Sequence, residues 1–116
     1  CKIRIKQRHM LQPKEVITMI KDVANVSMPQ GSRILLFGSQ ARGDAHEESD
    51  WDILILLDKP RIEHTDFDEV AYPIIEMGWR LGIAVNPLLY TYKDWEKRHF
   101  TPFYKNVQKD GIELWH

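Results

Sequence analysis

The sequence lacks most of the features that would set it apart from an ordinary globular domain. Its 116 residues include one cysteine, Cys1, which excludes an internal disulfide and a cysteine-based zinc site. No apolar run approaches the ~18 residues of a membrane-spanning helix, and no signal peptide is recognisable. The net charge is −1, so no overall field attracts the chain to nucleic acid or to a membrane. We therefore expect a single cytoplasmic domain over residues 1–116, without a membrane contact.

Apolar periodicity predicts alternating helices and strands in this ordinary composition, which is 43% hydrophobic and 28% charged. Strands are predicted at residues 32–37, 51–57, 83–90 and 112–115, and helices at 13–27, 66–81, 92–98 and 101–110. The first two strands show no polar alternation beyond their ends, so we expect them to be buried on both faces. Pro87 predicts that the third strand is an edge or breaks there, and Pro73 predicts a kink near Ala71.

Asp50 and Asp52 stand at the start of the predicted strand 51–57, one residue apart. Residues two apart in a strand share a face, so both carboxylates point the same way and Trp51 points the opposite way. Two carboxylates on one face repel each other unless a cation lies between them, and magnesium typically binds one or two carboxylates together with substrate phosphates. The pair is therefore a candidate metal site. The alternative is a structural pair that caps a neighbouring helix.

Gly38 and Ser39 end the predicted strand 32–37, opposite the acidic pair. Glycine lets the backbone approach a phosphate closely, and N–H groups at the start of a following helical turn favour anions. A phosphate cradle beside two carboxylates is the minimum equipment for phosphoryl or nucleotidyl transfer. Arg42 has two interpretations of equal weight: it pairs with phosphates or with the aspartates, or it braces the loop.

The strings GSQARG at residues 38–43 and SDWD at residues 49–52 closely resemble the signature of the minimal nucleotidyltransferases, which belong to the polymerase-beta-like superfamily. The resemblance covers about residues 32–90. It implies an α+β fold in which a small mixed sheet carries its helices mainly on one face, like the palm of those polymerases.

The resemblance also implies a transfer of a nucleoside monophosphate from ATP or another NTP to an acceptor hydroxyl. Asp50 and Asp52 would be catalytic and would hold Mg²⁺ or Mn²⁺. Gly38, Ser39 and Arg42 would bind the nucleotide.

The sequence departs from the family pattern at one position. Active members carry a third carboxylate on the strand beside the acidic pair, whereas the matching strand here offers Ala84 and Asn86. The amide of Asn86 can supply a neutral oxygen to a metal but cannot act as a base. The departure supports a second hypothesis, a catalytically impaired nucleotide-binding or antitoxin module that acts by contact with its partner.

The resemblance also implies what kind of partner protein the chain binds. Family members of this size often pair with a helical HEPN protein in toxin–antitoxin modules, and a tyrosine of that partner can be the acceptor. Whether the chain forms a homo-oligomer stays open. A third hypothesis, binding of single-stranded nucleic acid, rests on basic and aromatic residues that interleave near the C-terminus; inward packing of the aromatics explains the same pattern and is favoured. These residues are Lys93, Trp95, Lys97, Arg98, His99, Phe100, Phe103, Tyr104, Lys105 and Lys109.

Overall fold

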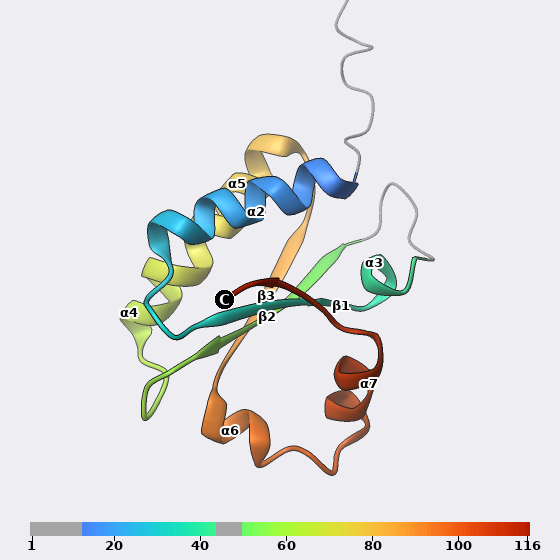
Figure 1. Cartoon of the computed structure of the whole chain (residues 1–116). Coiled ribbons are helices and arrows are strands. Elements are labelled where there is room, and N and C mark those ends of the chain that lie inside the picture. Colours follow the sequence, from blue (N-terminus) through green and yellow to red (C-terminus); the bar gives the residue numbers. More distant parts are fainter. Residues whose placement is uncertain (1–12, 44–49) are drawn as a thin grey trace, which may run out of the picture.

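A four-stranded mixed sheet forms the centre of the computed structural model, which describes residues 13–43 and 50–116 (Figure 1). The strand order is β3-β2-β1-β4. Strand β1 is antiparallel to both β2 and β4, and β3 is parallel to β2. The strands are β1 (Arg33–Phe37), β2 (Trp51–Leu57), β3 (Val85–Thr91) and β4 (Ile112–Trp115). The predicted strands are confirmed, with small shifts at the ends of the first and third.

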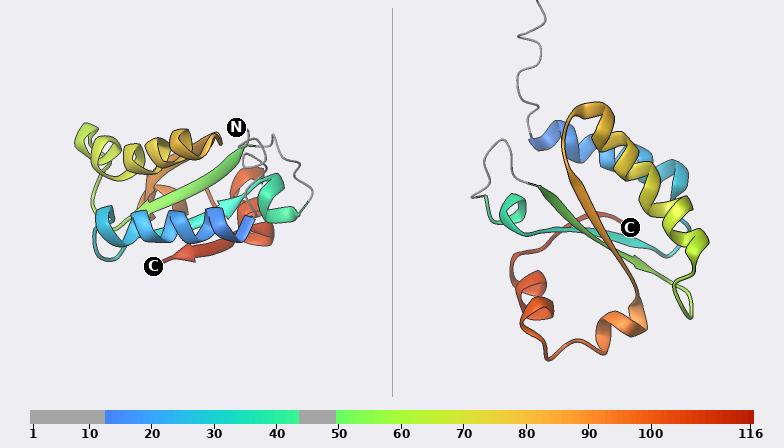
Figure 2. Two further views of the ribbon diagram at one scale, coloured as in Figure 1. Left: turned by 90° about the horizontal axis from the view of Figure 1, so that it is seen from above. Right: turned by 180° about the vertical axis from the view of Figure 1, so that it is seen from behind.

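The helices lie on both faces of this sheet (Figures 1 and 2). They are α2 (Pro13–Ser27), α3 (Ser39–Arg42), α4 (His64–Asp66), the π-helical segment η1 (Phe67–Ala71), α5 (Tyr72–Leu81), α6 (Tyr92–Glu96) and α7 (Pro102–Asp110). The predicted disturbance by Pro73 is observed, because the π-helical segment ends at Ala71 and α5 begins at the next residue, Tyr72. None of these helices, within the described ranges, has the length and hydropathy of a membrane-spanning segment.

The larger of two apolar clusters lies between the sheet and the layer of α2, η1 and α5. It takes in one face of the sheet, and its buried members are Val16, Ile20, Ala24, Ile34, Leu36, Trp51, Ile53, Ile55, Leu57, Val70, Ile74, Met77, Val85 and Leu114. As expected, most of the helical residues lie on this face, in α2, η1 and α5, while the shorter α6 and α7 lie on the other.

A smaller cluster covers the opposite face of the sheet, where α6 and α7 lie. Its buried members are Leu35, Leu54, Leu56, Trp95 and Val107. Trp95 is 5% exposed, and its ring centroid lies 5.5 Å from that of Phe103 and 4.8 Å from that of Tyr104. Trp95, Phe103 and Tyr104 therefore pack inward against the sheet, as predicted, whereas Phe100 does not and is 69% exposed.

Strand β2 is the most deeply buried element, because both clusters contact it. Ile53, Leu54, Ile55 and Leu57 have no measurable exposure. Pairing with β1 on one edge and β3 on the other satisfies its backbone. Because β2 is enclosed on both faces and paired on both edges, it fixes the backbone of Asp52, its second residue; Asp50 directly precedes the strand.

Truncation of Leu54 tests the contribution of the smaller cluster. We expect Leu54→Ala to lower the free energy of unfolding by about 2–5 kcal/mol, because the lost methyl groups leave a cavity in a buried strand. Val26, which is 89% exposed on α2, provides the control, and Val26→Ala should change that free energy by less than about 0.5 kcal/mol. Urea unfolding of both variants measures the difference. Equal midpoints would contradict the packing of Leu54 in this cluster.

Candidate active site

The candidate site lies where β1 ends and β2 begins, beside α3 (Figure 1). The antiparallel register pairs Phe37, the last residue of β1, with Asp52 in β2. The residue after Phe37 is Gly38, so the turn into α3 starts next to the Asp52 side chain. The structure thus brings together the two strings, GSQARG and SDWD, as far as they lie in the described ranges; Ser49 lies outside them.

The carboxylates of Asp50 and Asp52 converge on one side chain of the neighbouring strand. The Asn86 amide nitrogen donates to Asp50 Oδ2 at 3.0 Å and to Asp52 Oδ1 at 3.3 Å. Trp51, between the two aspartates, is buried in the larger cluster on the other face of the sheet. The placement of both carboxylates on one face is therefore as the spacing predicts.

Gly38 lies close to Asp52 and adopts a conformation that favours glycine. Its φ is 78° and its ψ is −156°, and a positive φ of this kind is strained for residues with a side chain. A Cβ atom at this position would lie 2.6 Å from Asp52 Oδ2. Backbone and carboxylate can therefore be this close only because glycine occupies the position.

Helix α3 places the remaining predicted nucleotide-binding residues. It is a single turn, in which the Gly38 carbonyl accepts hydrogen bonds from the N–H groups of Ala41 and Arg42, both at 3.1 Å. Gly43 ends it in a left-handed conformation, and its N–H donates to the Ser39 carbonyl at 3.0 Å. Ser39 thus directly follows the glycine that contacts Asp52, and Arg42 lies at the other end of the turn. Their roles in nucleotide binding stay predictions.

The ligands that this site offers a metal are oxygens. Two carboxylates suit a hard divalent cation such as Mg²⁺ or Mn²⁺, and the Asn86 amide could add its carbonyl oxygen. Within residues 13–43 and 50–116, no group of three or more histidine, cysteine or acidic side chains is arranged to hold a metal. The register sets Asn86 beside Asp52, at the place where the sequence resemblance led us to look for a third carboxylate.

Two features of the site are not predicted by the sequence. The sequence indicates at most an oxygen ligand at Asn86, whereas its nitrogen faces both aspartates. Ala84, the other residue named at that strand, instead contributes its backbone carbonyl, which accepts from the Trp51 N–H at 2.8 Å. The parallel pairing of β2 and β3 explains both, because it sets Asn86 beside Asp52. No signal within one sequence gives the orientation of the amide.

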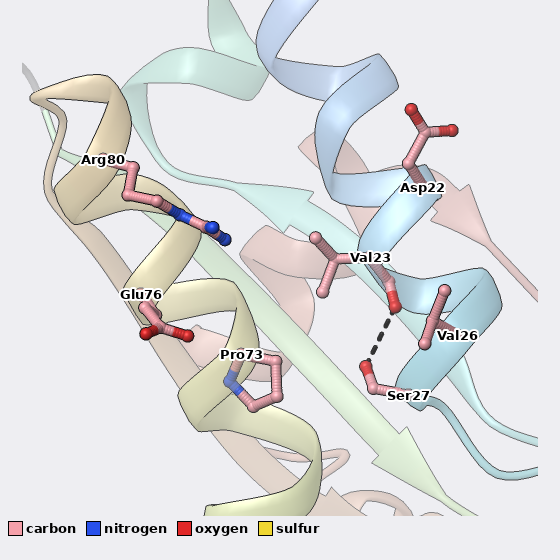
Figure 3. Close-up of a pocket in the computed structure, with 7 residues that line it drawn as sticks. All are labelled: Asp22, Val23, Val26, Ser27, Pro73, Glu76 and Arg80. Atoms are coloured by element: carbon pink, nitrogen blue, oxygen red, sulfur yellow. Dashed lines mark hydrogen bonds between the residues drawn. The ribbon is translucent and has the colours of Figure 1, made fainter.

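A groove between α2 and α5 is separate from this site (Figure 3). Its lining residues are Asp22, Val23, Val26, Ser27, Pro73, Glu76 and Arg80. The Ser27 hydroxyl is engaged in α2 itself, where it donates to the Val23 carbonyl at 2.9 Å. None of the predicted site residues lines the groove, so the groove is not part of the candidate active site.

The chain is similar to several known proteins. The family model of the nucleotidyltransferase domain matches residues 19–113. A relative from Methanocaldococcus jannaschii, named "Putative protein adenylyltransferase", is 36% identical over 83 residues, which are 72% of this chain and 77% of the relative.

Two solved structures share the fold. The crystal structure of a toxin–antitoxin with AMP-PNP has a TM-score of 0.60 and 21% identity, over 90% of this chain and 73% of that one. The structure of a tri-AMPylated Shewanella oneidensis HEPN toxin in complex with an MNT antitoxin has a TM-score of 0.56 and 19% identity, over 90% of this chain and 72% of that one.

Substitution of Gly38 tests whether its close contact with Asp52 matters for cation binding. Gly38→Ala should weaken Mn²⁺ binding by more than about tenfold, since the new methyl group displaces a carboxylate that ligates the ion. Gly82 offers a matched control, because its φ is 76° and a Cβ there meets nothing within 4 Å. Gly82→Ala should lose about 1–2 kcal/mol of stability, because its backbone is left-handed. Gly38→Ala should lose at least as much, because at φ 78° and ψ −156° its backbone lies in a region that only glycine readily adopts. Mn²⁺ titration of both variants measures the difference, and equal affinities would show that the Gly38 contact has no bearing on the site.

Proposed function

The chain belongs to the nucleotidyltransferase domain family, and from this premise we propose that it transfers AMP from ATP to a hydroxyl group of a partner protein. The observation that carries the proposal is the convergence of Asp50 and Asp52 beside Gly38, at the start of a fully enclosed strand. A rigid pair of carboxylates next to an accessible backbone suits the positioning of a triphosphate.

Asp50 and Asp52 would hold Mg²⁺ or Mn²⁺, with the Asn86 amide beside them. When bound, the ion supplies charge neutralisation for the triphosphate and for the leaving pyrophosphate. The fit rests on the donor set, which consists of hard oxygens. The described residues contain no cluster with the imidazole and thiolate ligands that softer metals prefer.

The protein's own groups would bind and orient the nucleotide. The Gly38 backbone lets a phosphate approach Asp52, and the Ser39 hydroxyl and N–H donate to phosphate oxygens. Arg42, on the same helical turn, adds a guanidinium charge. The acceptor oxygen then attacks the α-phosphorus, the bond from that phosphorus to the bridging oxygen breaks, pyrophosphate leaves, and the hydroxyl proton passes to water.

The acceptor is proposed from the relatives. One relative is named a protein adenylyltransferase, and a structure of the same fold holds an AMPylated HEPN toxin together with an MNT antitoxin. We therefore assign a helical HEPN-type toxin as the partner and a tyrosine of that toxin as the acceptor, within the cytoplasm. In this proposal the chain is the antitoxin, and AMP on the tyrosine ring oxygen inactivates the toxin.

A second candidate function is favoured by one observation, the presence of Asn86 where the family carries an acid. Without that carboxylate the chain could neutralise its partner by contact alone, with ATP bound or absent. The two functions differ in a single consequence: only the first requires covalent modification of the partner.

Asp52→Asn separates the two functions. With ATP labelled at the α-phosphate and the HEPN-type partner, the variant should lose label transfer by more than about 100-fold, because a metal ligand is removed from a rigid site. Asp58→Asn provides a matched control, since Asp58 is an exposed aspartate just past the opposite end of β2. It should transfer label as the wild type does.

Complex formation is measured in the same samples by size-exclusion chromatography. Asp52→Asn should still form the complex, because the substitution is local, yet fail to relieve toxicity in cells. Full protection by the unlabelled complex would contradict the enzymatic role and would establish neutralisation by contact.

A further inference from the structure

Asn86 makes contacts that are unusual for an exposed side chain. It lies on the edge strand β3, opposite Asp52 in the parallel register. Its amide nitrogen donates to both aspartates, at 3.0 Å and 3.3 Å. An amide nitrogen carries two N–H groups, so this one side chain supplies a donor to each carboxylate.

We propose that Asn86 is a positioning residue that holds Asp50 and Asp52 together before metal binding and limits the site to one tightly bound divalent ion. The inference rests on the proposed function and deepens it, because it concerns the metal content of the same site. Asparagine in place of a third carboxylate would then have a function of its own in the site.

The first part of the inference follows from charge. Two carboxylates on one face of a strand repel each other. The enclosed strand fixes the backbone of Asp52, but both aspartate side chains are partly or fully exposed, so apolar packing does not hold the carboxylate groups together. The N–H groups of the Asn86 amide carry partial positive charge and face both acids. Hydrogen bonds to charged acceptors are stronger than neutral ones. The amide therefore keeps the ligands converged when no cation is present.

The second part follows from what the same amide can do when a cation arrives. A half-turn about its terminal torsion, which is broad and nearly two-fold, exchanges the positions of nitrogen and oxygen. The amide then presents its oxygen to the ion, and its N–H groups, which would repel the ion, point away from it. Asn86 is thus a donor to the empty acidic pair and an oxygen ligand in the filled site.

The limit of one ion also follows from charge. The formal charge of the pair is that of two carboxylates, and the neutral amide adds none, so one divalent ion neutralises the site. A third carboxylate at this position would add the negative charge and the oxygens that a second ion requires.

Mn²⁺ titration of the whole chain, followed by the electron paramagnetic resonance of the free ion, tests the inference. The wild type should bind one ion per chain. Asn86→Asp should bind a second ion, or bind the first at least tenfold more tightly. Asn86→Ala should bind at least tenfold more weakly, because it loses both the positioning contact and the oxygen. Asn106→Asp adds the same charge on the exposed surface of α7 and should match the wild type.

A second measurement is the difference between the thermal unfolding temperatures in EDTA and in Mn²⁺, which a purely structural role would not change. In EDTA, Asn86→Asp should unfold at a lower temperature than the wild type, because three carboxylates meet without a cation. In saturating Mn²⁺ the unfolding temperature of Asn86→Asp should return to that of the wild type. A structural effect alone would lower both temperatures equally, and this result would overturn the inference.

The outcomes separate this inference from the function it rests on. If the wild type binds Mn²⁺ and Asp52→Asn does not, the metal site is supported. If both Asn86 variants then bind as the wild type does, the proposed role of Asn86 is wrong. Tighter binding by Asn86→Ala would likewise overturn it, since the amide would then only compete with the ion. If the wild type binds neither Mn²⁺ nor ATP, the proposed function itself fails.

Discussion

Two negative charges placed side by side are the constraint on which this structure depends. Asp50 and Asp52 point to the same face and share one amide as a hydrogen-bond donor. Their mutual repulsion would separate flexible side chains, and three features oppose it: the enclosed strand that carries Asp52, the Asn86 amide, and the glycine backbone that closes against Asp52. Carboxylates that are held together in this way favour a cation between them, and that preference connects the fold to its chemistry.

The two apolar clusters act mainly to hold the strand that bears these acids. Trp51, Ile53 and Ile55 face the cluster under α2 and α5, whereas Leu54 and Leu56 face the cluster under α6 and α7. Because a one-residue shift would send every side chain to the opposite face, burial of both faces fixes the register. The register in turn pairs Asp52 with Phe37 on one side and with Asn86 on the other. The site is therefore set by packing on both sides of one strand.

Much of this arrangement could be predicted from local patterns. The apolar run 51–57 predicts its strand with the observed bounds, and the helix predicted at 13–27 also has the observed bounds. The two-residue spacing is sufficient to place both carboxylates on one face. The orientation of the Asn86 amide could not be predicted in this way, because it depends on a contact between strands that are far apart in the sequence. The cover of the second face by α6 and α7 depends likewise on tertiary packing of Trp95.

Calorimetric titration with a non-hydrolysable ATP analogue, in the presence and absence of MgCl₂, tests the central claim most directly. The claim is that Asp50 and Asp52 together bind a nucleotide through a divalent ion. The account predicts binding by the wild type that requires magnesium and is lost in Asp52→Asn. Equal binding with and without magnesium, or equal binding by the two proteins, would contradict it, because the acidic pair would then have no part in holding the nucleotide.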